Sequence, residues 1–408
     1  MNRSRIAWLI AGSALIGSSG LLACSSSKGS PDAGSGNDAA NDATADTPPD
    51  SAPKPAPIIT HPNPIISQRN TRYPVSAADV NDNNYHNGGW TTKVTDLPVS
   101  AAIMIGAGPT RLLVQWDDGG TYNYKDPPGT TVYGFPMGYT IDVSGDTTTG
   151  ADGTWTSVVT VTDNAVRTRG HVIDFTGKTW VRMTITAAPP TESSNGVQIG
   201  EIDVHDISGS PDLPDDTWFF MGDSITAFAY DRAQAHQPSF ASLIHTALPA
   251  YFPAMINGGI GSELSTDGLA RLPEALALNP AYRFFVLGYG TNDANRGNMD
   301  TYKSNMQAMT DMVKAAGKIP IVPRMPYATN TLYAMTGQFN TVVDELVASN
   351  HLLAAPDFYA FFMANQDDFT CPPCGGGRVT DGLHPDDTGL QAMNQLWATA
   401  AMPLYPSP

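Results

Sequence analysis

Apolar residues follow two different patterns along the chain, and the pattern changes near residue 210. From 211 to 408, short unbroken apolar runs alternate with stretches in which apolar residues recur every three or four positions. Unbroken runs are typical of strands buried on both faces, and the longer period is typical of helices. The alternation predicts an α/β domain of three layers, α/β/α, with helices on both faces of a parallel sheet.

The expected elements of this domain follow from the apolar positions. The strand-like runs are 218–221, 255–256, 284–287, 319–322 and 352–355. The helical stripes are Phe240, Leu243, Ile244 and Ala247; Tyr302, Met306, Met309 and Val313; Phe339, Val342, Val343, Leu346 and Val347; and Leu390, Met393, Trp397 and Ala400. Pro238 is suited to open the first helix and Gly317 to end the second.

Residues 58–210 show no helical period and contain short runs in which apolar and polar residues alternate. The runs are 111–116, 139–143, 157–162, 171–175, 181–186 and 197–204. Within one of them, Val181, Met183 and Ile185 face one way and the polar residues face the other. Such alternation is typical of half-buried antiparallel strands, so this segment is predicted to be an all-β sandwich domain.

Residues 1–24 have the layout of an export signal. A basic start with Arg3 and Arg5 precedes an apolar stretch that is too short to span a bilayer. The segment ends in Leu-Leu-Ala-Cys, which resembles a bacterial lipobox and implies that Cys24 becomes the lipidated first residue of the mature protein. An ordinary signal peptide, cut near the same place, is the alternative.

Residues 25–57 consist mainly of Ser, Gly, Asp, Ala, Asn and Pro. A segment with so few large apolar residues cannot offset the entropy of ordering, so it is predicted to be a disordered linker. No acidic residue follows Cys24 directly. By likeness to lipoprotein sorting signals, the expected location is the outer membrane or the cell surface of a bacterium.

Three cysteines are present in the chain. If Cys24 carries lipid, Cys371 and Cys374 remain to form a disulfide in an oxidising compartment. A redox-active or zinc-binding Cys-x-x-Cys is the alternative, although no second Cys or His pair stands at zinc-ligand spacing. No metal and no cofactor is therefore predicted.

The chain is acidic, with a formal net charge of −17, and only 15% of its residues are charged. A negative surface disfavours nucleic acids and other anionic polymers as partners. Neutral substrates fit this composition better.

The candidate chemistry begins at Ser224, which directly follows the apolar run 218–221 and the pair Gly222-Asp223. A serine hydroxyl is a weak nucleophile, so it needs a base, a group that orients the base, and hydrogen-bond donors for the oxyanion. Asp381 and His384 are three residues apart, which places both on one side of a single turn, where Asp381 could orient the imidazole. Glycine-rich segments at 257–262 and 288–293 could supply the donors.

Four motifs in this order resemble the SGNH, or GDSL-type, hydrolase superfamily of esterases and lipases. They are Gly-Asp-Ser at 222–224, Asn-x-Gly-x-Gly at 257–261, Gly-Thr-Asn-Asp at 290–293 and Asp-Gly-Leu-His-Pro at 381–385. The resemblance covers residues 215–408 and implies a flavodoxin-like SGNH hydrolase domain at 211–408. It also implies Ser224 as the nucleophile, His384 as the general base and Asp381 as the partner of His384.

The resemblance implies three donors for the oxyanion. Two are the backbone amide of Ser224 and the side-chain amide of Asn292. The third in the family is the amide of a glycine five residues after the asparagine of the second motif. Ser262 stands at this place and Gly261 just before it, so either amide is a candidate.

The first domain resembles the discoidin or galactose-binding-like jelly rolls, which include carbohydrate-binding modules. The resemblance lies in residues 139–144, 152–156 and 199–204. Aromatic residues in loop-like sequence could stack on sugars; these are Tyr85, Trp90, Tyr122, Tyr124, Tyr133 and Phe135. Trp116, Trp155 and Trp180 are expected to pack in the core. Sugar binding and a purely structural role both remain open for this domain.

Together these features predict an exported, lipid-anchored serine esterase that removes acetyl groups from a polysaccharide. The family implied by the motifs contains carbohydrate acetylesterases. One alternative is an esterase, thioesterase or lysophospholipase that acts on lipids or short acyl chains. Another, from a different class, is a surface lipoprotein that binds glycans without catalysis.

Overall fold

The computed structural model describes residues 58–59, 65–66, 80–81, 90–118, 134–188, 197–209, 216–229, 239–366 and 381–405. The expected export signal and linker lie outside these residues. So do the three cysteines, Cys24, Cys371 and Cys374, and the residues Tyr85, Tyr122, Tyr124, Tyr133 and Pro238. In the part of the chain that is described, no helix combines the length and apolarity needed to cross a membrane.

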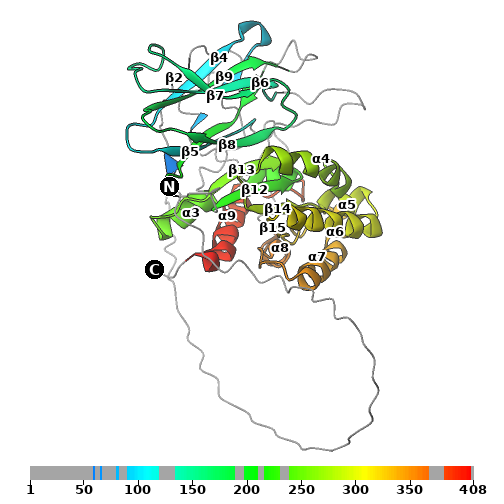
Figure 1. Cartoon of the computed structure of the whole chain (residues 1–408). Helices are drawn as coiled ribbons and strands as arrows, with labels where there is room; N and C mark the ends of the chain where they lie inside the picture. Colours follow the sequence, from blue (N-terminus) through cyan, green and yellow to red (C-terminus); the bar gives the residue numbers. More distant parts are fainter. Residues whose placement is uncertain are drawn as a thin grey trace, which may run out of the picture. The chain divides into compact units, whose positions relative to one another are not determined.

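A parallel sheet of four strands forms the centre of the second half of the chain (Figure 1). Its order is β13-β12-β14-β15. The strands are β12 (Thr217–Gly222), β13 (Ala254–Gly259), β14 (Phe284–Gly288) and β15 (Ile319–Ile321). Four of the five predicted runs are therefore confirmed as strands. Gly222 pairs with both Gly259 and Gly288, so three strands end at the same edge of the sheet.

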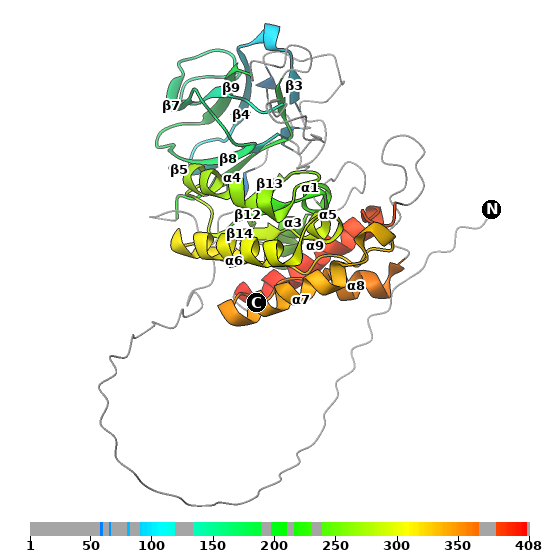
Figure 2. The same ribbon diagram turned by 90° about the vertical axis from the view of Figure 1, so that its right-hand side faces the viewer.

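Helices cover both faces of this sheet, because alternate strand residues are apolar on each face (Figures 1 and 2). Phe219 and Met221 of β12 pack with α4, α6 and α7, whereas Trp218 and Phe220 pack with α1, α3, α8 and α9. The helices are α1 (Ser224–Ala229), α3 (Phe240–Ala247), α4 (Ser265–Leu278), α5 (Thr291–Arg296), α6 (Met299–Ala315), α7 (Thr336–Asn350), α8 (Phe358–Ala364) and α9 (Asp387–Ala401). The four predicted helices are confirmed as α3, α6, α7 and α9, and Gly317 follows α6 with a left-handed φ of 69°.

The fifth predicted strand, 352–355, is wrong. This run leads into α8 without strand structure, and parallel pairing is reduced to a single bridge between Arg324 and Asp357. Pro323, Pro326 and Pro356 surround this bridge. Because proline has no N–H to donate, a longer ladder cannot form there.

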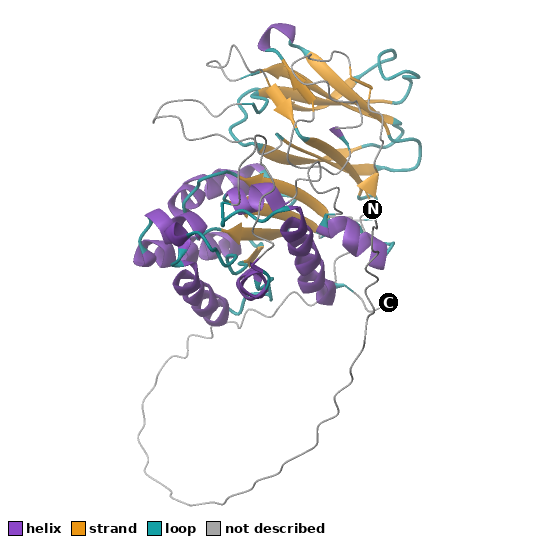
Figure 3. Cartoon of the chain, turned by 180° about the vertical axis from the view of Figure 1, so that it is seen from behind, coloured by secondary structure: helices purple, strands orange, loops and turns teal. Residues whose placement is uncertain are grey.

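The first half of the chain contains antiparallel sheets (Figure 3, orange). One sheet has the order β2-β4-β9-β6-β7, with β2 (Ile65–Ile66), β4 (Val99–Met104), β6 (Gly138–Ser144), β7 (Thr156–Val161) and β9 (Trp180–Ala187). Another has the order β1-β11-β5-β8, with β1 (Ile58–Ile59), β5 (Arg111–Asp117), β8 (Thr168–Asp174) and β11 (Glu201–Asp206). β3 (Trp90–Thr92) pairs with β10 (Val197–Ile199). Side chains of all three sheets share one apolar core. The sandwich and its jelly-roll resemblance stay predictions.

Three expectations for this part need correction. The run 197–204 is not one strand, because it is interrupted at Gly200 between β10 and β11. Trp155, expected in the core, is half-buried at the surface, where Arg182 lies 4.1 Å above its ring. Conversely, Trp90 and Phe135, considered for sugar stacking, are buried and cannot offer a ring face to a sugar.

Trp116 and Trp180 are buried as expected, with 1% and 7% of their surface exposed. Four strands, β1 to β4, have no counterpart among the predicted runs.

The antiparallel strands of the first half and the parallel sheet share buried hydrogen bonds within one compact unit. Gln115 of β5 donates to the carbonyl oxygen of Met255 at 2.7 Å and accepts from the hydroxyl of Tyr282 at 2.9 Å. Asn279, just after α4, donates to Thr168 and accepts from the amide of Gly170. Strand β13, at the edge of the parallel sheet, is therefore covered by β5 and β8.

Candidate active site

The position of Ser224 depends on how closely α1 follows β12. A Cβ atom at Gly222 would overlap the hydroxyl of Thr226 and lie 2.6 Å from the carbonyl oxygen of Gly288. A Cβ atom at Gly259 would likewise overlap the backbone of Ala227. Glycine at these strand ends lets α1 lie directly on the sheet, which places Ser224 at the carboxyl edge of the strands.

Two hydrogen bonds join Ser224, His384 and Asp381 in a chain. The Nε2 atom of His384 lies 2.9 Å from the hydroxyl oxygen of Ser224, and the Nδ1 atom lies 2.6 Å from one carboxylate oxygen of Asp381. The other carboxylate oxygen accepts from the backbone amides of Leu383 and His384, both at 2.9 Å. Asp381 therefore fixes both the turn and the ring. Phe228 of α1 meets the imidazole edge-on, with ring centroids 5.3 Å apart.

Asp381 is held as a carboxylate by these contacts. Its burial alone would raise the pKa, but the hydrogen bond and charge of His384 and the two backbone amides lower the pKa of Asp381 to about 2. A carboxylate at Nδ1 favours the tautomer that carries its proton there. In that tautomer Nε2 is an acceptor and can take the proton of Ser224.

The three backbone amides that the motifs suggest as oxyanion donors are those of Ser224, Gly261 and Ser262. Within the described residues, the amides of Ser224, Gly261 and Ser262 make no hydrogen bond. Ser262 has a φ of +65°, a left-handed conformation that glycine adopts without strain. Among the described residues, the left-handed conformation lies at Ser262, the place of the glycine in the motif that the sequence resembles, and not at Gly261.

Helix α5 is hydrogen-bonded to the segment that contains Gly261 and Ser262. Asn292 donates one side-chain proton to the carbonyl oxygen of Glu263 at 3.0 Å, and Arg296 donates to that of Ser262 at 2.7 Å. The carboxylate of Asp293 accepts from the amide and the hydroxyl of Ser265. The second proton of this amide makes no hydrogen bond within the described residues. Sequence reasoning missed Asp293 and Arg296 as supports, although Asp293 is part of the Gly-Thr-Asn-Asp motif.

One expected placement is corrected here. The predicted strand-like run 255–256 ends before Asn257, but β13 extends to Gly259, so Asn257 lies inside the strand. Its side chain donates to the carbonyl oxygen of Ala227 at 3.0 Å and accepts from the amide of Gly259 at 2.9 Å. Asn257 thus joins the end of α1 to β13, and the loop begins only at Ile260.

Asp223 is a buried carboxyl directly before Ser224. None of its surface is exposed, and one oxygen accepts from the amide of Ile225 at 2.9 Å. Burial, together with the charges of Asp293 and Glu263, raises the pKa of Asp223 to about 7. The hydrogen bonds from the amide of Ile225 and from the side chain of Thr291 oppose this rise. Ionised Asp223 therefore destabilises the fold.

This shift predicts how the stability of Asp223→Asn varies with pH. Between the ordinary pKa of 3.8 and about 7, the folded protein holds a proton that the unfolded chain has released, so the stability of the parent protein falls as pH rises. The full penalty is roughly 4 kcal/mol, at about 1.4 kcal/mol per pKa unit. The asparagine side chain does not titrate, so the variant should gain stability relative to the parent between pH 4 and pH 8. Urea unfolding at both values measures the gain, and a difference independent of pH would contradict the prediction.

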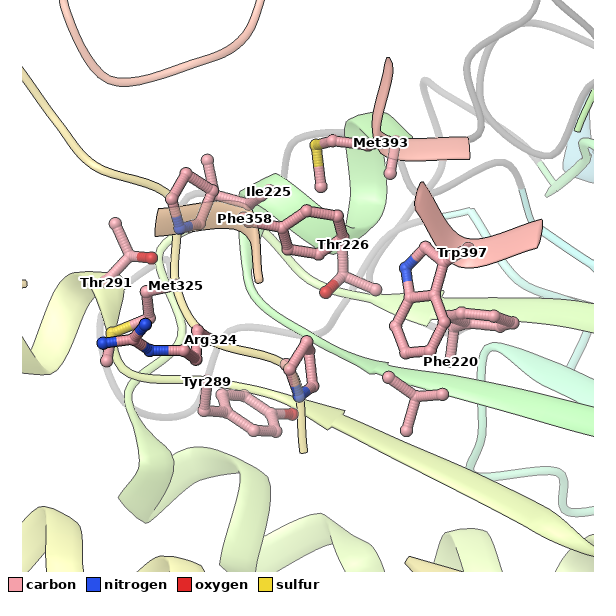
Figure 4. A pocket seen from close by; sticks show the side chains of 15 residues that line it. Phe220, Ile225, Thr226, Tyr289, Thr291, Arg324, Met325, Phe358, Met393 and Trp397 are labelled. Atoms are coloured by element: carbon pink, nitrogen blue, oxygen red, sulfur yellow. The ribbon is translucent and has the colours of Figure 1, made fainter. Parts of the chain in front are cut away.

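A small cavity of about 30 Å³ is lined by residues of α1, α8, α9 and the sheet (Figure 4). Most of its walls are apolar, with Phe220, Phe358 and Trp397 among them, and the hydroxyl of Thr226 faces it. Ser224 and His384 do not line this cavity. It therefore belongs to the packing of α1, α8 and α9 on the sheet rather than to the serine and histidine. In the described residues, no cluster of His, Cys, Asp and Glu could hold a metal ion.

Residues 220–392 match the model of the GDSL-like lipase/acylhydrolase family. Among solved structures, TesA is 23% identical, with 46% of this chain and 99% of its own covered at a TM-score of 0.36. Axe2, an acetylxylan esterase from Geobacillus stearothermophilus, is 19% identical, and the match covers 47% of this chain and 97% of Axe2 at a TM-score of 0.35. LAE5, an α/β hydrolase from the metagenome of Lake Arreo, Spain, is 15% identical, with 47% and 96% covered at a TM-score of 0.38. No curated protein sequence matches the chain.

Proposed function

We propose that this chain, whose residues 220–392 match a family of acylhydrolases, is a serine ester hydrolase that forms an acyl-enzyme on Ser224. The observation that carries the proposal is the chain of hydrogen bonds from Ser224 through His384 to Asp381. A nucleophile, a base and a group that orients the base are the parts such chemistry needs.

In the first half-reaction, the hydroxyl oxygen of Ser224 attacks the ester carbonyl carbon while Nε2 of His384 accepts the hydroxyl proton. The imidazolium that forms is stabilised by the carboxylate of Asp381. His384 then gives its proton to the leaving alcohol oxygen as the carbon–oxygen bond breaks. In the second half-reaction, His384 deprotonates a water that attacks the acyl-enzyme, and the acid is released.

The negative charge on the carbonyl oxygen of the tetrahedral intermediates is held by fixed donors. We assign this role to the amides of Ser224 and Ser262 and to the side chain of Asn292. Because these donors are already in place, they stabilise charge that develops only during the reaction, and each is worth about 3 kcal/mol of barrier. The contacts of α5 with the carbonyl oxygens of Ser262 and Glu263 hold two of the donors in place, the side chain of Asn292 and the amide of Ser262.

For the substrate, we propose small acyl groups, and above all acetyl, carried by a polysaccharide. Support comes from the β-sandwich strands that precede the hydrolase domain and from the net charge of −17, which disfavours anionic polymers. Carbohydrate acetylesterases occur in the family that the motifs resemble. We further propose export and anchorage through Cys24, on the basis of the sequence of residues 1–24.

The test of this function compares acetate release from acetylated xylan with hydrolysis of medium- and long-chain lipid esters, with Ser224→Ala as the blank. We expect acetyl esters to be preferred by at least about tenfold in kcat/KM, since pocket size discriminates by such factors per methylene. A preference for long acyl chains would move the assignment to lipids. Inactivity on both, without labelling of Ser224, would favour the glycan-binding protein that lacks catalysis.

A further inference from the structure

The loop between β15 and α7 is fixed at its start by a buried side chain. Asn340 of α7, which is fully buried, accepts from the amide of Met325 at 2.8 Å and donates to the carbonyl oxygen of the same residue at 3.1 Å. Both backbone groups of Met325 are thus held by one residue. The loop therefore leaves the sheet in a defined direction.

Four residues further on, the loop binds the turn that carries Asp381 and His384. The amides of Thr329 and Asn330 donate to the carbonyl oxygen of Gly382 at 2.9 and 3.0 Å. The side-chain amide of Asn330 donates to the carbonyl oxygen of Asp381 at 2.9 Å. Gly382 has a φ of +67°, and a Cβ atom there would lie 2.6 Å from the hydroxyl of Thr329. The contact is therefore close as well as hydrogen-bonded.

The side-chain nitrogen and the side-chain oxygen of Asn330 bind different segments of the chain. While its nitrogen contacts Asp381, its oxygen accepts from the amide of Leu332 at 3.1 Å and caps the short helix η3 (Thr331–Tyr333). η3 lies beside α5, and the first turn of α5 contains Asn292, the proposed oxyanion donor. Asn330 thus joins the acid–base turn to the element next to the oxyanion helix.

We propose that Asn330 is a positioning residue, which sets the placement of Asp381 and through it the orientation of His384. The proposal rests on the proposed ester hydrolysis. The backbone of Asp381 must be held in place because its two carboxylate oxygens have different partners. One oxygen contacts Nδ1 of His384, and the other accepts from the backbone amide of His384. A displacement of about 1 Å in such a group can cost up to about a hundredfold in rate. Asn330 belongs to none of the four motifs.

The competing explanation is that Asn330 only caps η3. The chain offers a matched control in Asn298, which caps α6 through its oxygen by accepting from the amides of Asp300 and Thr301 and is exposed. A second variant, Asn330→Ser, separates the two roles of Asn330. Serine caps helices well but is too short to reach the Asp381 carbonyl.

The experiment measures kcat and KM of the full chain with 4-nitrophenyl acetate, alongside the thermal midpoint. We expect Asn330→Ala and Asn330→Ser to lower kcat roughly 10-fold or more with KM within about twofold. Asn330→Ser should keep the parent's thermal midpoint, and Asn298→Ala should lose stability while keeping kcat. In an Asp381→Asn background, the effect of Asn330→Ala should fall to less than about twofold, because residues that act through one another are not additive.

Three results would overturn the positioning role. One is equal loss of kcat from Asn330→Ala in both backgrounds. Another is an unchanged kcat in Asn330→Ser, and a third is a loss in Asn298→Ala as large as in Asn330→Ala. Failure of the proposed function would look different, because the parent chain itself would then not hydrolyse the ester.

Discussion

Replacing Ser224 by alanine should abolish the formation of an acyl-enzyme. The Ser224 hydroxyl is the group that lies 2.9 Å from Nε2 of His384, at the carboxyl edge of the sheet. Without it, His384 can activate only water, and the remaining donors can stabilise only the direct hydrolysis. In serine hydrolases such a change lowers kcat by about a millionfold, leaving a residual rate from the oxyanion donors and binding.

The measurement is covalent labelling by a fluorophosphonate, followed by mass spectrometry of the intact chain and of its peptides. The parent should gain one adduct on the peptide with Ser224, and the Ser224→Ala variant should gain none. Ser349→Ala serves as the control, because Ser349 lies near the end of α7 and bonds the carbonyl oxygen of Leu346 and the side chain of Asn350. It should be labelled like the parent. Labelling of Ser224→Ala at the same rate would contradict the role of Ser224 as nucleophile.

The carboxyl-edge placement of Ser224 could be predicted from sequence for a simple reason. An unbroken apolar run predicts a strand buried on both faces, and a parallel sheet brings the ends of such strands to one edge. Gly222 and Gly288 end two paired strands in register, so the residues that follow them, including Ser224 and Asn292, must come close. The argument needs no knowledge of side-chain contacts.

The supports of the site could not be predicted in this way. Asn330 and Arg296 act through backbone carbonyl oxygens of distant residues, and any residue type provides such an oxygen. No pattern in the sequence therefore marks the pairing. The raised pKa of Asp223 is similar, because it arises from burial and from Asp293 and Glu263, which come close only in the fold.

The wrong expectations have local causes that the apolar pattern does not contain. The run 352–355 is apolar like a strand, but prolines next to the bridge that follows it remove the donors of a ladder. Trp155 is large and aromatic, yet it directly precedes β7, an edge strand with mostly exposed side chains. There Arg182 packs on its ring, so hydrophobic size alone does not decide burial.

Replacing Asp381 by asparagine should lower kcat by about 10⁴-fold while leaving the fold intact. The oxygen of asparagine can still accept from the amides of Leu383 and His384, so the turn is preserved. The other end of the side chain becomes an N–H₂ donor that faces Nδ1 of His384. This donor favours the tautomer with the proton on Nε2, and that nitrogen can then no longer accept the proton of Ser224.

Asp381→Asn changes both the tautomer of His384 and the charge of the turn. The chain contains a control that removes a charge without changing the tautomer. Asp386, two residues after His384, caps α9 by accepting from the amides of Thr388 and Gly389. Asp386→Asn keeps an excellent cap and removes the same charge from the same segment. Its kcat with 4-nitrophenyl acetate at about pH 8 should stay within a few-fold of the parent. In the parent and in Asp386→Asn, Asp381 is fully ionised at this pH, because its pKa is about 2. A difference in kcat between Asp381→Asn and Asp386→Asn therefore does not come from partial protonation of Asp381. A similar loss in both variants would mean that negative charge near the turn, and not the bond to Nδ1, is what the reaction requires.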